Sequence, residues 1–220
     1  MAYKKQTLKY FFSVEGETEE LYLKWLENEI NSDDNAKYRV SLNPDTREPI
    51  KFVKSLNTLG KTTIYHLMDY ESDEAQHVER FMEVMRNMKK AQDLGKQVKY
   101  KLCYSNLTFD LWIILHKVDC YTQFAHRKNY LSVINRAYNE KFESMKEFKE
   151  GKNLERCLKK LNIDNVMDAV SRANKIMRKN TDNGYMPQQF MGYKYYRENP
   201  SLEVGNVIGN ILSDCGLIKK

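Results

Sequence analysis

Cysteine and histidine are both scarce, with four of each among the 220 residues. The cysteines stand at positions 103, 120, 157 and 215, too far apart for a zinc knuckle or a Cys-x-x-Cys redox pair, and four are few for a disulfide framework. The histidines are scattered, which excludes the His-Glu-x-x-His type of metal site. We therefore expect reduced and mostly buried thiols.

Long hydrophobic runs are missing as well. The densest apolar clusters, such as residues 111–115, are only a helix turn or a strand long, so we expect no membrane span. The basic N-terminus leads directly into a strand-like run without a small-residue cleavage site, which argues against a secretory signal. These features predict a cytoplasmic protein that does not bind membranes.

The charge is modest overall but unevenly distributed. The net charge is +6, which permits a nucleic-acid partner without requiring one. Residues 15–34 and 69–79 are rich in acid, whereas Lys and Arg dominate much of residues 86–179. Acidic islands in a basic chain suit a metal-dependent enzyme that acts on a polyanion, although the solvation of helices produces the same pattern.

Strand-like and helix-like segments alternate over the first 117 residues. The patterns predict strands at 7–14 and 38–44, at the run TTIYHLM before the acids from residue 69, and at the run KQVKYKLCYS. Amphipathic patterns between them predict helices at 18–29, 47–59 and 74–94. This order indicates βαβ units and a mostly parallel sheet flanked by helices, an α/β fold.

The second half of the chain has a different character. Residues 129–180 are lysine-rich and helical in pattern, residues 184–196 are rich in glycine and aromatic residues, and a last helix is expected at 201–213. We therefore predict an α/β domain over residues 1–120 and a helical C-terminal region over residues 121–220, packed on the first.

Acidic residues follow two of the expected strands directly. Glu15 follows the first strand, and Asp69, Glu71 and Asp73 follow the third. Because functional sites gather at the carboxyl ends of parallel strands, Glu15 and Asp69 are expected to meet, with the alternating acids of the third strand pointing the same way.

Converging carboxylates repel one another unless a cation joins them. Oxygen ligands favour Mg²⁺ or Mn²⁺ over zinc, and such an ion could polarise a phosphate and activate water. Simpler interpretations remain: Ser72 or Asp73 could cap the next helix, and Glu19 and Glu20 are expected to complement the dipole of the first helix rather than bind a metal.

Two further stretches carry candidate residues. In the apolar run after Asp110, His116 could act as a general acid or phosphate contact, or it could be a satisfied buried ring, whereas Trp112 is expected in the core. Near the C-terminus, aromatic residues interleave with Lys194 and Arg197, which suits substrate contacts through stacking and phosphate binding, but also core packing beside a solvated face.

Four motifs resemble the RloB-like family, also called RloB/AbiLii: VEGETEELYLKWL, HLMDYESDE, SNLTFDLWIILHK and NPSLEV. These are small bacterial proteins of defence loci whose N-terminal part resembles the Toprim domain. The resemblance implies that Glu15 is the Toprim glutamate and that Asp69 and Glu71 form the Mg²⁺-binding pair, with Glu71 standing where aspartate is usual.

The third motif of the family aligns with Asn106, Asp110, Trp112 and His116. Asp110 replaces the commoner glutamate, and Leu107 replaces the usual proline. The first change shortens the reach of the carboxylate, and both changes are conservative in chemistry.

We therefore predict a Mg²⁺-dependent (or Mn²⁺-dependent) nuclease of a prokaryotic anti-phage abortive-infection system, with RNA or tRNA favoured over DNA. The expected catalytic residues are Glu15, Asp69, Glu71 and His116. The expected metal ligands are Glu15, Asp69, Glu71 and Asp73. The expected substrate contacts are Asn106, Asp110, Lys194 and Arg197.

Two other hypotheses remain open. The chain could be a non-catalytic nucleic-acid-binding or regulatory subunit of a defence complex. It could also be a toxin that stays silent until a partner ATPase of the same locus, or a phage trigger, releases it.

Overall fold

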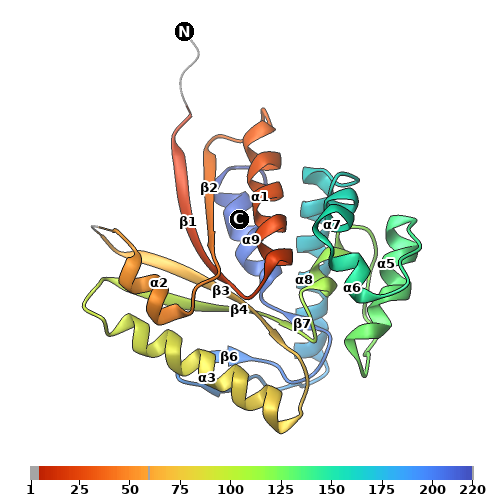
Figure 1. The fold of residues 1–220 in the computed structure, drawn as a ribbon. Helices are drawn as coiled ribbons and strands as arrows, with labels where there is room; N and C mark the ends of the chain where they lie inside the picture. Colours follow the sequence, from red (N-terminus) through yellow and green to blue (C-terminus); the bar gives the residue numbers. More distant parts are fainter. Residues whose placement is uncertain (1–4, 59, 220) are drawn as a thin grey trace.

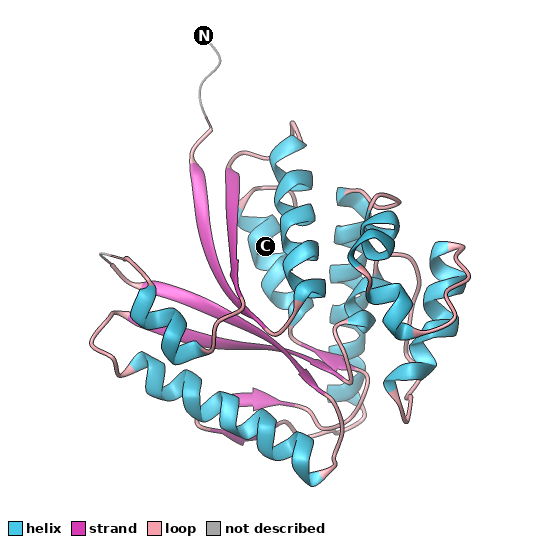
Figure 2. Cartoon of the chain, viewed as in Figure 1, coloured by secondary structure: helices cyan, strands magenta, loops and turns pink. Residues whose placement is uncertain are grey.

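A computed structural model describes residues 5–58 and 60–219 and shows a five-stranded sheet flanked by helices (Figures 1 and 2). The strands lie in the order β2-β1-β3-β4-β7. Their bounds are β1 (Thr7–Val14), β2 (Arg39–Asp45), β3 (Thr62–Tyr70), β4 (Val98–Asn106) and β7 (Ser201–Leu202). The first four strands pair in parallel and β7 joins β4 antiparallel, so the predicted mostly parallel α/β fold is confirmed.

The three helices between these strands cover opposite faces of the sheet. They are α1 (Glu17–Ser32), α2 (Pro49–Ser55) and α3 (Ala75–Gln92). The apolar stripe of α1 packs on one side with Phe12 and Val14 of β1, while α2 and α3 pack on the other side with Ile64 and Met68 of β3. The chain thus reverses its direction of winding between β1 and β3, which lie next to each other. Their carboxyl ends form the topological switch point, where ligands bind in open α/β sheets.

Most of the C-terminal region is helical, as expected. Its helices are α5 (Tyr130–Tyr138), α6 (Met145–Lys149), α7 (Gly151–Leu158), α8 (Ile163–Asp182) and α9 (Val204–Asp214), with a 3₁₀ turn, η1, at Arg127–Asn129. Helix α4 (Asp110–Leu115) precedes this region. The apolar run after Asp110, for which helix and strand were both open, is the short helix α4. The described helices are all too short or too polar to cross a lipid bilayer.

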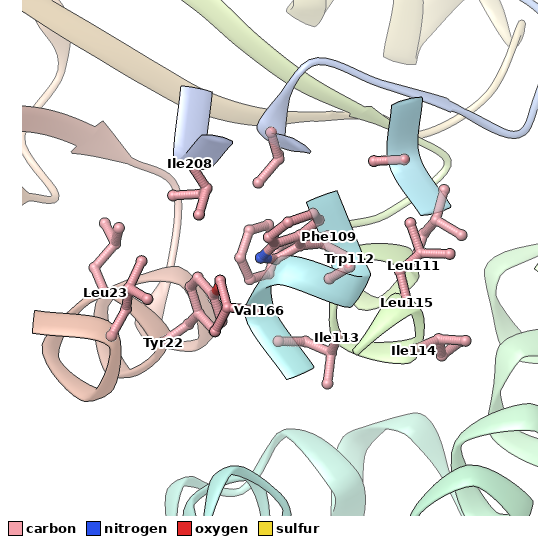
Figure 3. Packing of buried hydrophobic residues seen from close by; sticks show 14 of the residues in the cluster. Tyr22, Leu23, Phe109, Leu111, Trp112, Ile113, Ile114, Leu115, Val166 and Ile208 are labelled. Atoms are coloured by element: carbon pink, nitrogen blue, oxygen red, sulfur yellow. The ribbon is translucent and has the colours of Figure 1, made fainter. Parts of the chain in front are cut away.

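The larger core is built around α4 (Figure 3). Trp112 is fully buried, and its ring meets the ring of Tyr22 from α1 edge-on at 6.2 Å. Val166 of α8 and Ile208 of α9 belong to the same cluster. The expectation that Trp112 belongs to the core is confirmed. All four cysteines are also buried and free, as the sequence predicted.

Strands near the C-terminus were not expected from the sequence. The aromatic stretch forms a hairpin of β5 (Gln188–Phe190) and β6 (Tyr193–Tyr195), and residues 201–202 extend the main sheet as β7 before α9 begins. The hairpin turn places Met191 at φ +50° and Gly192 at φ +86°, a conformation that glycine adopts without steric cost. The last helix therefore starts at residue 204 rather than 201.

Candidate functional site

The carboxyl ends of β1 and β3 bring Glu15 and Asp69 together. The backbone N–H of Asp69 donates a hydrogen bond of 3.2 Å to Oε2 of Glu15. This contact spans 54 positions in the sequence and follows from the register, which sets Val14 beside Leu67. The meeting of the two strand ends at the switch point is as the sequence predicted.

Asp69 is partly buried, and within the described residues its carboxylate forms no ion pair, so that the charge of Lys149 is the one that compensates it. Its Oδ1 atom is buried and has no hydrogen-bond partner among the described residues. Burial raises the pKa of Asp69 well above its usual range, and the negative charges of Glu19, Glu15 and Asp110 raise it further, against the opposing effect of Lys149. Four carboxylates therefore share one electrostatic environment, which we call the acidic cluster: Glu15, Glu19, Asp69 and Asp110.

The structure places Glu19 in the acidic cluster, whereas the sequence interpretation gave it only a role at the start of the first helix. It stands in the first turn of α1 but is only 8% exposed, and its pKa is raised to about 7, chiefly by burial. Glu20, by contrast, forms an ion pair with Lys24 on the outside of the helix. Glu19 shares the helical face of Tyr22, Leu23 and Leu26, which are buried too. That apolar stripe is the sequence signal that could have identified it.

The buried Asp110 and the partly exposed Lys149 form an ion pair inside the cluster. The Asp110 side chain is fully buried; its Oδ2 accepts hydrogen bonds from Oγ1 of Thr108 at 2.8 Å and lies 3.1 Å from Nζ of Lys149. Its Oδ1 has no partner in the described part of the chain. Burial lowers the pKa of Lys149, but the charges of Asp110, Asp69 and Glu19 outweigh it and raise the pKa. Lys149 was not predicted as a site residue, because residues 129–180 contain many lysines and the sequence pattern does not distinguish it from the others.

Glu71 lies at the rim of the cluster among basic side chains. Its carboxylate is 3.7 Å from Arg80, 3.5 Å from Arg127 and 3.7 Å from the ring of His77. Arg80 also lies 3.8 Å from Oε1 of Glu15, so one guanidinium bridges two of the acids that the sequence singled out. The rim therefore presents positive charge next to the buried negative charge.

Asp73 faces away from the cluster. Its Oδ1 accepts hydrogen bonds from the hydroxyl of Tyr70 at 2.6 Å and from Arg197 at 2.9 Å. Burial alone would raise the pKa of Asp73, but these two bonds lower it overall. The expectation that Asp69, Glu71 and Asp73 point the same way is wrong, because β3 and its alternation end at Tyr70, between Asp69 and the other two acids.

Two of the expected substrate contacts, Asn106 and Lys194, lie outside the acidic cluster, whereas Asp110 lies inside it. The Asn106 amide donates to the backbone carbonyls of Tyr196, Arg197 and Glu198, where we expected a substrate contact. Lys194 is exposed on β6. The structure does not bring either residue into the acidic cluster.

His116 lies in the aromatic core. The ring is fully buried, with Nε2 3.1 Å from the hydroxyl of Tyr22 and Nδ1 2.9 Å from the carbonyl oxygen of Trp112. Burial lowers its pKa to about 4. Of the two interpretations left open by the sequence, the structure shows the satisfied buried ring, and His116 is not among the residues gathered at the switch point.

The cluster fits a divalent cation in its chemistry. Its donors are carboxylate oxygens, which Mg²⁺ and Mn²⁺ prefer, and the unpartnered Oδ1 atoms of Asp69 and Asp110 are free acceptors. Glu15, Asp69 and Glu19 are the residues that could hold the ion, with Glu71 at the rim. Within residues 5–58 and 60–219, however, no three histidine, cysteine or carboxylate side chains already stand at metal-binding spacing.

The fold and the site together define an α/β protein with an acidic site at the switch point of its sheet. The model of the family described as RloB-like protein matches residues 10–211, and the chain belongs to this family. The resemblance inferred from the motifs is thereby confirmed. No curated protein and no solved structure matches the chain.

Proposed function

We propose that this protein is a Mg²⁺-dependent nuclease that hydrolyses phosphodiester bonds, with RNA favoured over DNA, in a prokaryotic anti-phage abortive-infection system. The observation that carries the proposal is the acidic cluster at the switch point, with two buried carboxylate oxygens that lack partners. The defence setting rests on what the resemblance to the RloB-like family implies. A partner ATPase of the same locus is one candidate partner.

The charges of the cluster favour a cation as the missing component. Among the described residues, the four carboxylates face Lys149 and, at the rim, Arg80. Burial still raises the pKa values of Glu15, Glu19 and Asp69, because these two cations compensate their ionised forms only in part. A bound Mg²⁺ would polarise the phosphate and activate a water molecule. The ion would need the carboxylates to turn toward it, since their present spacing is not that of a completed site.

The residues of this chain would divide the remaining tasks. Glu15, whose side chain is 25% exposed, stands where it can accept a proton from an attacking water. Arg80, beside Glu15 and Glu71, can neutralise charge that develops on a phosphate. Lys149 holds Asp110 in the cluster.

A second candidate function has its own support. Lys149 already supplies one positive charge to the cluster, and no ready-made set of three metal ligands occurs in the described chain. Both facts favour a non-catalytic nucleic-acid-binding or regulatory subunit. Asp69→Asn would then leave function intact.

Cleavage assays on RNA and DNA with and without Mg²⁺ or Mn²⁺ test the proposal. We expect metal-dependent cleavage that Glu15→Gln lowers at least about 100-fold, the effect of removing a general base. Glu20→Gln is the matched control, because Glu20 lies nearby and pairs outward with Lys24.

Growth arrest on overexpression, tested with the same two variants, covers a toxin that needs a cellular trigger. Equal cleavage and equal growth arrest in the wild type and Glu15→Gln would contradict the nuclease assignment.

A further inference from the structure

A cavity of about 290 Å³ opens beside Glu15 on the side of the sheet covered by α2 and α3. Its walls are the end of β1, the connection from β2 to α2, His66 of β3, and one face of α3. That face consists of Arg80, Glu83, Val84 and Asn87, which recur at helical spacing. We call this space the switch-point cavity, because it lies where the sheet reverses its winding.

His66 is the buried polar group of this cavity. It is 4% exposed, and neither ring nitrogen has a hydrogen-bond partner among the described residues. The ring stands edge-on to Tyr100 at 6.5 Å. Burial lowers the pKa of His66 to about 4, so the ring is neutral at pH 7 and carries one donor and one acceptor. An unpartnered buried imidazole costs free energy that a hydrogen-bonding ligand would recover.

The charges around the cavity disfavour a free anion. Arg47 is already engaged by a bidentate ion pair with Asp45, and Arg80 contacts carboxylates of the acidic site. Glu48 and Glu83 add negative charge to the wall. Among the described residues of the lining, both arginines thus already face carboxylates, with Arg80 directed to the acidic site, so the cavity itself favours a neutral polar group.

The lining suits a flat heterocycle. The Asn87 amide offers a donor and an acceptor side by side, the pattern with which amides read base edges. Arg47 lines the cavity with its guanidinium over the ring of Phe52 at 5.7 Å, and guanidinium planes stack on bases. A volume of about 290 Å³ lies at the lower end of ligand pockets and suits one base.

We propose that the switch-point cavity binds a nucleobase of the substrate strand, next to the phosphate that lies at the acidic cluster. Glu15 belongs to both sites, so the two sites adjoin. His66 and Asn87 read the edge of the base, and Arg47 stacks on its face. This inference rests on the proposed function, and it makes the cavity the element that selects the sequence to be cut.

Binding of the four uncharged ribonucleosides, followed by NMR chemical-shift changes in the full-length wild type, tests the base site without any phosphate. We expect at least one nucleoside to shift signals of the cavity residues, with affinities that differ at least fivefold among the four. His66→Leu and Asn87→Ala should each weaken the preferred nucleoside at least fivefold. Gln76→Ala, an exposed amide on the same helix and outside the cavity, should leave it unchanged.

The outcomes separate this inference from the nuclease assignment. Base-selective binding with neither cleavage nor growth arrest that depends on Glu15 would support the cavity and contradict the nuclease. Metal-dependent cleavage together with no nucleoside binding, or with equal responses in the wild type and both variants, would overturn the base site and leave the nuclease standing. Asn87 is half-exposed, so Asn87→Ala is expected to fold. A loss of nucleoside binding seen in both Asn87→Ala and His66→Leu is therefore not explained by misfolding.

Discussion

Single residues decide the electrostatics of the acidic cluster. Glu15 and Asp69 could be placed from the sequence, because each stands at the end of a strand and parallel neighbours bring strand ends together. Glu19 and Lys149 could not be placed in the same way. A glutamate in the first turn of a helix is expected there for its favourable interaction with the helix dipole, so its position alone does not mark Glu19 as a site residue. Lys149 contacts Asp110, 39 positions away in the sequence, and local sequence patterns do not predict such a contact.

Replacing Lys149 by methionine is expected to destabilise the protein by about 1–3 kcal/mol. The change leaves the fully buried carboxylate of Asp110 without its cation, and the partial exposure of Lys149 reduces the cost from that of a fully buried pair. Urea unfolding gives the free energies. Adding Asp110→Asn in the same chain should recover most of the loss, because the buried side chain at position 110 then carries no charge that needs the lysine. A double variant as unstable as the sum of the single variants would contradict the coupling.

At the scale of elements, the helices and strands with a clear hydrophobic period could be predicted from the sequence, and the very short strands could not. The alternating strands and helices up to residue 117 carry their own local patterns. Strands of two or three residues, such as β5, β6 and β7, have too few positions to show a period. Contacts with side chains distant in the sequence stabilise these short strands. One example is the Asn106 amide, which donates to backbone carbonyls of the connection between β6 and β7.

Asn106→Ala should loosen the connection between β6 and β7. Its amide is a shared donor to three successive carbonyls of that connection, and it is nearly fully buried. We expect a loss of about 1–3 kcal/mol in stability, because buried carbonyls lose their donor. Hydrogen exchange should become faster over residues 193–202 and stay unchanged in β1 and β2. Uniformly faster exchange would contradict a local role.

Gly205 allows α9 to approach α8 closely. A side-chain carbon at this position would collide with Cβ of Ala173 and come within 3.5 Å of Trp112. Gly205→Ala should therefore destabilise the protein by about 1–3 kcal/mol, despite the better helix propensity of alanine. Asn210→Ala on the same helix, an exposed position, should change stability by less than about 0.5 kcal/mol. Thermal or urea unfolding of both variants measures the difference.

At the scale of the whole molecule, buried titratable groups link folding to pH. His66 and His116 are both neutral in the folded protein, with pKa values lowered from 6.5 to about 4 by burial. Their contribution to stability is complete above pH 6.5 and is lost as the pH falls toward 4, because the unfolded chain binds protons that the folded chain excludes. Glu19, with a pKa raised to about 7, acts in the opposite direction, since its contribution is lost as the pH rises from 4.5 to 7.

His66→Leu isolates one of these contributions. As the pH falls from 6.5 to 4, the wild type should lose unfolding free energy relative to the variant, by up to about 1.4 kcal/mol per pH unit. Urea unfolding at several pH values measures it, and the other groups cancel in the difference. A difference that does not change with pH would show that His66 is not held neutral by burial.

The central claim is that the acidic cluster binds a divalent cation, and calorimetric titration with Mg²⁺ or Mn²⁺ tests it most directly. We predict saturable binding to the wild type and to Asp73→Asn, whose side chain faces Arg197 instead of the cluster. Asp69→Asn should abolish this binding while retaining the fold by circular dichroism. Absence of binding at millimolar metal in the wild type, or equal binding by Asp69→Asn, would contradict the account.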